Sequence, residues 1–279
     1  MFHITFDLEI YDPIKNLNGK AKEKFISEQE VILKKIFSLL NESNVKISCF
    51  VTNEFLDVYN DFFHDYIVKY HEVGCHTASH MFFNGDNLSE FVEDIKLNKE
   101  KLEREIGLKC QGFRAPGGMV PNNLIHILNK FDFKYDSSVV PGIMPGRFNH
   151  SNVSKEPYFP DFDNIFTSSG ENEKIIEFPL ITSKFTKISM NGVLFSIYNK
   201  FIDLDEYENN FGVVYLHPSD FKKFSFFEKA FMWDKMKLTR NNWDFLSDYV
   251  YTIKSRDIRL ITLCALEIKE NEMHISKLD

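Results

Sequence analysis

The stretch HTASH, residues 76–80, decides the fold that this sequence predicts. Gly74 stands just before it, an apolar, β-rich run lies further upstream, and a helical pattern begins at about Ser89. The stretch therefore lies where a strand gives way to a loop, the edge at which α/β barrels carry their active sites. Four residues apart, His76 and His80 would share one side of a helical turn and could hold a divalent metal through neutral ring nitrogens. The same spacing also occurs by chance, so on its own it leaves an ordinary pair of histidines open.

The length and composition indicate a globular protein with a sizeable core. At 279 residues, of which 43% are apolar, the chain can form one large α/β barrel or two ordinary domains. The formal net charge is −8, from 33 basic and 41 acidic residues. Because nucleic-acid binding normally leaves a basic footprint, no nucleic acid is expected as a partner.

The start of the chain and the cysteines favour a cytoplasmic protein. Residues 1–7 contain no basic segment followed by an apolar one, and no later stretch approaches the ~18 uninterrupted apolar residues of a membrane span. The cysteines are widely separated and form no CxxC pair, as expected for reduced thiols: Cys49, Cys75, Cys110 and Cys264. We therefore expect a cytoplasmic protein without a transmembrane segment.

Apolar runs and helical patterns alternate along the chain. Strands are expected at 2–8, 45–51, 72–75, 111–113, 133–135, 175–180, 193–198, 212–216 and 259–263. Amphipathic helices are expected at 27–44, 54–70, 89–106, 122–130 and 242–254. Ser27 and Glu30 could form a capping box at the start of the first helix. Without an internal repeat or a clear linker, this order predicts one α/β domain over residues 1–279.

The periodicity is lost between residues 141 and 172. Prolines and glycines punctuate this stretch: Pro141, Gly142, Pro145, Gly146, Pro157, Pro160 and Gly170. A loop of this length is usually functional or disordered, and its aromatic residues favour an ordered cover. We expect an insertion at about 141–172 that covers a substrate site.

Polar residues suited to catalysis stand at several predicted strand ends. Asp7 and Glu9 close the first strand, and further candidates follow later ones: Arg114, Asp136 and His217. Taken singly, Arg114 could form a surface ion pair, Asp136 an Asx turn, and His217 could be a core histidine. Their common placement at strand ends, together with the pair in 76–80, favours one shared site.

Five short motifs resemble those of the polysaccharide deacetylases, carbohydrate esterase family four. They are Thr5-Phe6-Asp7-Leu8-Glu9, His76-Thr77-Ala78-Ser79-His80, Arg114-Ala115-Pro116-Gly117-Gly118, Tyr135-Asp136-Ser137-Ser138 and Leu216-His217-Pro218. Each motif is short, but all five occur in order and span nearly the whole chain. The resemblance implies a distorted (β/α) barrel, here with seven strands, and an enzyme that removes acetyl groups from sugars with one divalent metal.

The resemblance also implies roles for single residues. Asp7 would accept a proton from the attacking water, and His217 would protonate the departing amine. Arg114 would hold and tune Asp7 through a charge-assisted hydrogen bond. His76 and His80 would bind the metal, expected to be zinc, with cobalt, manganese or nickel as alternatives. Three further residues are expected to contact the substrate: Pro116, Tyr135 and Asp136.

The first motif departs from the family pattern at Leu8. The family has two adjacent aspartates, the second of them a metal ligand, whereas leucine cannot coordinate a metal. Glu9 lies one residue further along and, on an extended strand, faces the same side as Asp7. We expect Glu9 to be the third ligand, with Asp7 itself or a water as the alternatives.

The expected function is a carbohydrate N-deacetylase, a hydrolase that removes an N-acyl group, most simply acetyl, from an amino sugar. Its substrate would be a glycan or a glycan precursor of surface polysaccharide biosynthesis, such as a nucleotide- or lipid-linked sugar. Leu8 leaves two alternatives. One is a metal-independent cyclic-amide hydrolase of allantoinase type, and the other is a catalytically silent relative that only binds carbohydrate.

Overall fold

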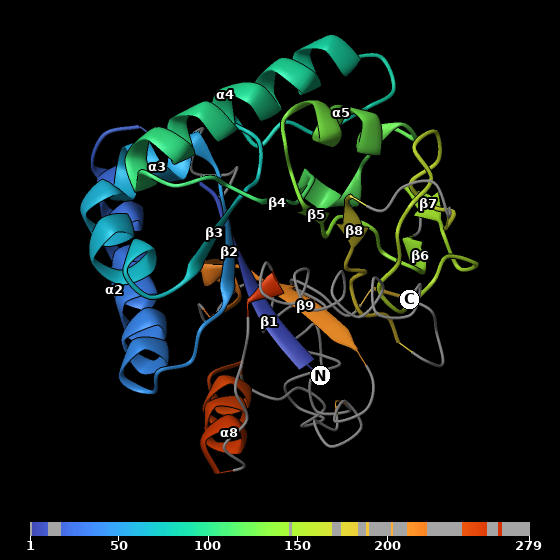
Figure 1. Cartoon of the computed structure of the whole chain (residues 1–279). Coiled ribbons are helices and arrows are strands. Elements are labelled where there is room, and N and C mark those ends of the chain that lie inside the picture. The colour runs from blue at the N-terminus through green and yellow to red at the C-terminus, as the bar shows by residue number, and fades with distance from the viewer. Residues whose placement is uncertain are drawn as a thin grey trace.

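Seven parallel strands form the centre of the protein in a computed structural model (Figure 1). The structure describes residues 2–10, 18–144, 147–168, 174–183, 188–189, 202, 211–221, 242–255 and 262–263. In this part of the chain the sheet forms a half-barrel with the strand order β8-β5-β4-β3-β2-β1-β9. The expected fold class, a distorted, seven-stranded (β/α) barrel, is confirmed.

Strands and helices alternate along most of the chain. The strands of the sheet are β1 (Phe2–Leu8), β2 (Ser48–Val51), β3 (Glu72–Cys75), β4 (Gly112–Phe113), β5 (Tyr135–Asp136), β8 (Ile176–Glu177) and β9 (Gly212–Leu216). The helices are α2 (Lys20–Glu42), α3 (Asn53–Phe62), its π-helical continuation η1 (Phe63–Val68), α4 (Leu88–Ile106), α5 (Leu124–Lys130) and α8 (Asn242–Ser255). Two short 3-10 turns follow strands of the sheet: η2 (Pro116–Gly118) follows β4, and η6 (Pro218–Phe221) follows β9. A separate antiparallel pair is formed by β6 (Ile143–Met144) and β7 (Phe148–Asn149).

The start of the first helix differs from the expected one. α2 begins at Lys20, well before Ser27, and its N-cap is Gly19. The capping box predicted for Ser27 and Glu30 is therefore wrong: Ser27 Oγ instead donates to Lys24 O inside the helix, at 2.9 Å. The intervening lysines, alanine and glutamate are good helix formers, which accounts for the earlier start.

Other expectations can be compared only where the structure describes the chain. The strand predicted at 193–198 lies outside the described residues, as do residues 259–261 of the strand predicted at 259–263. Cys49, Cys75 and Cys110 are buried free thiols, as expected. Among the described residues, no helix combines the length and the apolar character that crossing a membrane requires.

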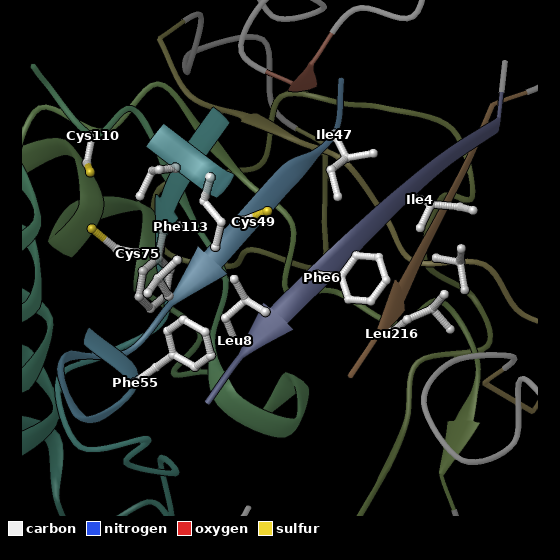
Figure 2. Close-up of a cluster of buried hydrophobic side chains, with 14 of the residues drawn as sticks. Ile4, Phe6, Leu8, Ile47, Cys49, Phe55, Cys75, Cys110, Phe113 and Leu216 are labelled. Atoms are coloured by element: carbon white, nitrogen blue, oxygen red, sulfur yellow. The ribbon is translucent and has the colours of Figure 1, made fainter. Parts of the chain in front are cut away.

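β1 separates the apolar core from a polar face. Phe6 and Leu8 are fully buried in the main hydrophobic cluster (Figure 2). Phe6 packs against Phe37 of α2, with the ring centroids 5.6 Å apart. Successive side chains of a strand point to opposite faces, so Thr5 and Asp7 are directed to the other side of the sheet. The strand thereby presents an acid to the site while it anchors the core.

The parallel sheet collects the candidate residues at one edge. In a parallel sheet all strands end on the same side, and the residue after each strand end lies there. Four of the predicted site residues occupy such positions: Glu9 after β1, His76 after β3, Arg114 after β4 and His217 after β9.

The segment expected to be an insertion packs against the end of the sheet. Tyr158 forms two backbone hydrogen bonds with Glu177 of β8, at 3.2 and 2.8 Å. Ile165 is fully buried, and its N–H donates to Asn122 O at 2.9 Å. This part of the chain therefore braces the barrel beside β8 and α5. Its expected role as a cover for the substrate stays a prediction.

Candidate metal centre

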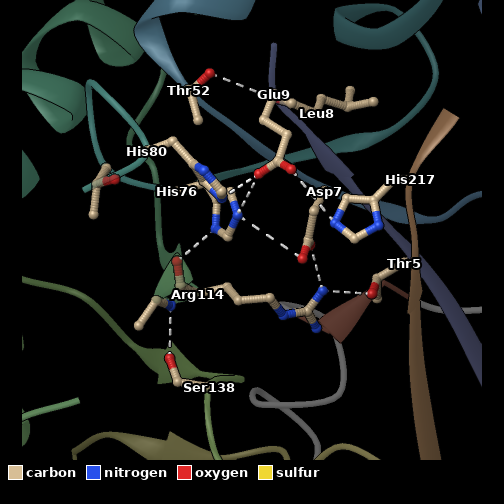
Figure 3. Close-up of polar contacts among 12 residues, drawn as sticks. Thr5, Asp7, Leu8, Glu9, Thr52, His76, His80, Arg114, Ser138 and His217 are labelled. Carbon is tan, nitrogen blue, oxygen red and sulfur yellow. Dashed lines mark hydrogen bonds and ion pairs between the residues drawn. The ribbon is translucent and has the colours of Figure 1, made fainter. Parts of the chain in front are cut away.

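Glu9, His76 and His80 converge at the carboxyl edge of the sheet (Figure 3). One ligand atom from each lies within 4.8 Å of the other two. Glu9 Oε2 lies 3.6 Å from His76 Nε2 and also contacts His80 Nε2. Burial alone would raise the pKa of Glu9, but hydrogen bonds with His76 and His80 and the charge of nearby His217 outweigh it and lower the pKa. The cluster thus joins two imidazoles and a carboxylate, which are zinc-binding groups.

The hydrogen bonds of the cluster leave suitable atoms free for a metal. His76 Nδ1 lies 2.7 Å from the backbone oxygen of Arg114. A carbonyl oxygen only accepts, so Nδ1 carries a proton and Nε2 is the nitrogen that could bind a metal. The buried Glu9 Oε2 faces the Nε2 atoms of both histidines.

The spacing of Glu9 and His76 also fits a single ion. Nitrogen and oxygen ligands about 2.1 Å from zinc in a tetrahedral site are roughly 3.4 Å apart. The distance between His76 Nε2 and Glu9 Oε2 is 3.6 Å. The residues therefore fit a divalent metal held by three protein ligands.

The two histidines lie in the loop after β3, as expected, but this loop does not form the expected helical turn. Thr77 and His80 have φ values of 60° and 59°, which residues other than glycine adopt at a cost. Thr77 Oγ1 accepts a hydrogen bond from Met81 N at 3.0 Å and stabilises the bend. The rings of His76 and His80 still meet, with centroids 5.1 Å apart. The helical turn predicted for residues 76–80 is therefore wrong, although the two rings lie together as their spacing suggested.

Two buried polar residues of α4 hold this loop, and neither was predicted from the sequence. Asn98 Oδ1 accepts from His76 N at 2.9 Å, and Asn98 Nδ2 donates to Val51 O at 3.0 Å. Asp94 Oδ2 accepts from the N–H and the hydroxyl of Ser79, at 3.0 and 3.2 Å. Asp94 and Asn98 are four residues apart and lie on the buried face of the helix. Polar residues on the inward face of an amphipathic helix are the signal that could have revealed them.

Replacement of Asn98 should loosen the metal loop. We expect Asn98→Ala to weaken zinc binding by about 10- to 100-fold, because His76 loses the anchor of its backbone. The free energy of unfolding should fall by about 1–3 kcal/mol from the buried groups left unpaired. Zinc titration calorimetry and urea unfolding measure the two effects, with Glu100→Ala at an exposed position of α4 as the control. Equal zinc affinity in Asn98→Ala and wild type would rule out a positioning role for this residue.

Asp7 and Arg114 form a buried ion pair beside the cluster. Arg114 Nη1 donates to Asp7 Oδ1 at 2.8 Å. The other carboxylate oxygen, Asp7 Oδ2, lies 3.9 Å from His76 Nε2. Asp7 and Arg114 are only 3% and 1% exposed, so the pair is shielded from water. One oxygen of Asp7 is thus held by the arginine, and the other faces the cluster (Figure 3).

Arg114 has a single orientation, because several groups fix its guanidinium. Nη1 also donates to Thr5 Oγ1 at 2.6 Å. Nε and Nη2 donate to the backbone oxygen and the hydroxyl of Ser137, at 2.7 and 2.8 Å. The ring of Phe50 lies 4.1 Å from the guanidinium carbon. The placement of Asp7 therefore depends on the ends of β1, β4 and β5 together.

His217 completes the polar face of the site. Its Nε2 lies 3.6 Å from Glu9 Oε1, and its Nδ1 lies 3.3 Å from Asp220 Oδ2. Burial by itself lowers the pKa of His217, but the hydrogen bond with Asp220 and the charges of Asp220, Glu9 and Asp7 outweigh it and raise the pKa to about 10. The side chain is 23% exposed. A protonated, accessible imidazole is suited to donating a proton to a leaving group.

The residues expected to contact the substrate are buried in this structure. Pro116 is buried and begins the turn η2, two residues after Arg114. Tyr135 is fully buried, and its hydroxyl donates to Glu72 Oε1 at 2.6 Å. Asp136 is also fully buried. Contact of these three residues with a substrate stays a prediction.

Leu8, the residue that departs from the family motif, lies in the core. Its side chain is fully buried among apolar neighbours (Figure 2). Its backbone oxygen accepts from Thr52 N at 3.1 Å. The acid that reaches both histidines is instead Glu9, one residue beyond the end of β1.

A family comparison agrees with the sequence motifs. The model of the family described as polysaccharide deacetylase matches residues 24–135. This range includes His76, His80 and Arg114 and leaves out Asp7 and His217. No curated protein matches the chain significantly.

Solved structures of polysaccharide deacetylases share the fold. A Mycobacterium smegmatis protein named as a polysaccharide deacetylase superimposes with a TM-score of 0.58 at 16% identity, over 92% of this chain and 91% of that chain. A mutant form of a peptidoglycan deacetylase from Bacillus subtilis gives 0.51 at 11% identity, over 99% and 94%. A pseudoenzyme of the CE4 family from Bacillus anthracis gives 0.50 at 13% identity, over 96% and 65%. At these identities the likeness shows the fold alone. The family model thus matches residues 24–135, and solved structures named as deacetylases share the fold of the chain.

Proposed function

We propose that the protein is a metal-dependent hydrolase that removes an N-acyl group, most simply acetyl, from an amino sugar. The match of residues 24–135 to the polysaccharide deacetylase family supports carbohydrate deacetylation as the type of reaction. The observation that carries the proposal is the convergence of Glu9, His76 and His80 beside the ion pair of Asp7 and Arg114. These groups are the ones that metal-assisted amide hydrolysis needs.

Each residue of the site takes a separate task in this proposal. Glu9, His76 and His80 would hold a divalent metal, which when bound would supply Lewis acidity to polarise the amide carbonyl and to make a water molecule more acidic. Asp7 accepts the proton of the attacking water through the oxygen that faces the cluster. Arg114 keeps that carboxylate in place.

His217 gives a proton to the departing amine in the same scheme. Its raised pKa, to about 10, keeps the imidazole protonated at neutral pH. The proton that Asp7 receives and the proton that His217 gives balance over the reaction, so the site returns to its starting state after proton exchange with water.

The finer parts of the proposal concern the metal and the substrate. Two imidazoles and one carboxylate suit zinc, with cobalt, manganese or nickel as alternatives. The substrate class is a glycan or a glycan precursor, including nucleotide- or lipid-linked amino sugars. A cytoplasmic location stays a prediction from the sequence.

The test is an assay on a broad panel of N-acetylated sugars, sugar nucleotides and oligosaccharides. Purified protein loaded with zinc should release acetate and expose a free amine, and a strong chelator should stop this release until metal is restored. Release that continues at full rate with the chelator would favour the allantoinase-type hydrolase. Glycan binding without turnover, unchanged by Asp7→Asn, would favour a silent carbohydrate-binding protein. No release from the whole panel with metal present would contradict the proposed function.

A further inference from the structure

Asp136 and Glu177 form a buried pair of acids next to the proposed active site. They are paired in register on the neighbouring strands β5 and β8, and both are fully buried. Their carboxyl groups lie close enough for each to affect the pKa of the other. A carboxylate can only accept a hydrogen bond, so a hydrogen bond between the two acids would require a proton on one of them.

The neighbouring hydrogen bonds leave a place for one proton. Asp136 Oδ1 accepts from Ser138 Oγ at 2.6 Å, and Glu177 Oε1 accepts from Val139 N at 2.9 Å. Within the described residues, no other donor reaches the second oxygens, Asp136 Oδ2 and Glu177 Oε2. A proton shared between these two oxygens would satisfy both.

The charges around the pair favour the same state. Arg114 acts on both acids, but its guanidinium is already paired with Asp7. Burial raises the pKa of Asp136 to about 6, and burial together with the charge of Asp136 raises that of Glu177 well above its ordinary value. Tyr158 packs beside them, and its hydroxyl donates to a backbone oxygen elsewhere, at 2.7 Å. Two adjacent buried carboxylates therefore cannot both ionise at neutral pH.

The turn after β5 connects the pair to Arg114. Ser138 Oγ donates to Asp136 and accepts from the backbone N–H next to Arg114, at 2.8 Å. Ser137 accepts from Nε and Nη2 of Arg114. On its other side the turn is held by Glu177, which accepts from the backbone of residue 139. A change in Glu177 is thus passed to the arginine through a continuous set of hydrogen bonds.

We propose that Glu177 is a positioning residue of this site, which in its protonated form donates to Asp136 and, through residues 136–139, fixes Arg114 beside Asp7. Loss of the shared proton at alkaline pH would place two negative charges together and displace the turn. The effect on turnover rests on the proposed hydrolase function. The shared proton is a property of the fold and is measurable without any substrate.

The first experiment compares stability as a function of pH in wild type and Glu177→Gln. The amide keeps the shape of the protonated acid, because its oxygen can accept from Val139 N and its N–H can donate to Asp136. Wild-type Glu177 holds its proton more tightly when folded than when unfolded. The stability of the wild-type protein must therefore decline as the pH rises from the ordinary pKa of glutamate toward the raised pKa of Glu177. The Glu177→Gln protein has no proton to lose at this position and should not show this decline.

Urea unfolding of both zinc-loaded proteins from about pH 4 to about pH 9 gives the ratio of their folding constants at each pH. Effects of the metal that are common to both proteins cancel in this ratio. We expect the folding constant of Glu177→Gln relative to wild type to rise by up to about tenfold per pH unit above about pH 5. Glu156→Gln, at an exposed acid of the adjacent segment, changes the charge equally and should give a flat ratio. A flat ratio for Glu177→Gln as well would overturn the shared proton.

The second experiment follows the Nε–H of Arg114, which is bonded to Ser137 O. Its exchange with solvent, observed by NMR, should be slow in wild type and Glu177→Gln. In Glu177→Leu it should be at least about tenfold faster, because the turn loses both hydrogen bonds to Glu177. If Glu177→Leu does not fold, wild type and Glu177→Gln still give a test. The exchange rate of the Arg114 Nε–H in wild type, divided by the rate in Glu177→Gln, should rise at alkaline pH.

Where the panel assay gives turnover, Glu177→Leu should lower kcat with little change in KM, and Glu177→Gln should restore kcat. Equal exchange of the Arg114 Nε–H in all three proteins would leave Glu177 a packing residue and overturn the positioning role. Because exchange and stability need no substrate, an inactive protein would count against the proposed function and not against the pair.

Discussion

His76→Ala and His80→Ala should each lose the metal and, with it, hydrolysis. Either change leaves two protein ligands, whereas catalytic zinc sites generally use three. Loss of a residue that only supports a ligand costs about 10- to 100-fold in metal affinity or activity, so loss of a ligand should cost at least about 100-fold in both. His80 is only partly buried and its ring contacts Glu9 and Phe82, so His80→Ala should keep its fold.

Metal content after gel filtration, measured by elemental analysis, checks this result. His76→Ala should also lose about 1–3 kcal/mol in the free energy of unfolding, because the buried backbone oxygen of Arg114 loses its donor. His126→Ala, at a surface histidine paired with Asp163, is the matched control and should retain metal and stability. Equal metal content in wild type and both site variants would eliminate the histidine clamp.

Glu9→Gln and Asp7→Asn should separate metal binding from catalysis. Glu9 contacts both histidines, whereas Asp7 reaches only His76 and has one oxygen taken by Arg114. An amide is a much weaker ligand than a carboxylate, so Glu9→Gln should weaken metal affinity by at least about tenfold, roughly 1.4 kcal/mol. Asp7→Asn should keep the metal and lower kcat by about 100- to 10,000-fold, the usual contribution of a general base.

Zinc titration and turnover of the same protein preparations test this division, with Glu156→Gln as the control for the loss of one negative charge. A carboxylate bound to a metal is a poorer proton acceptor, so one acid could not perform both tasks well. If Asp7→Asn lost the metal while Glu9→Gln kept both metal and rate, the roles assigned to the two acids would be reversed.

The gathering of the site could be predicted because it follows from the sheet. Apolar runs before Glu9, His76, Arg114 and His217 marked strands, and parallel strands that end together bring these residues to one edge. Alternation along β1 also predicted that Asp7 and Glu9 would share a face. In the structure both acids reach His76.

Other features depend on contacts that no local pattern reveals. The path of residues 76–80 is set by Asp94 and Asn98 of α4, so the helical spacing of the two histidines did not determine their backbone. The pairing of Glu177 with Asp136 depends on the register of two short strands that are distant in sequence. Sequence reasoning identified Asp136 but had no means of finding its partner.

The metal assigned to Glu9, His76 and His80 is tested most directly by anomalous diffraction at the zinc edge, from a crystal soaked in zinc. We expect one strong peak about 2.0–2.2 Å from Glu9 Oε2, His76 Nε2 and His80 Nε2, with Asp7 bound to Arg114 and outside the coordination sphere. A peak coordinated by Asp7 in place of Glu9, or a fully soaked crystal without a peak at these histidines, would contradict the assignment.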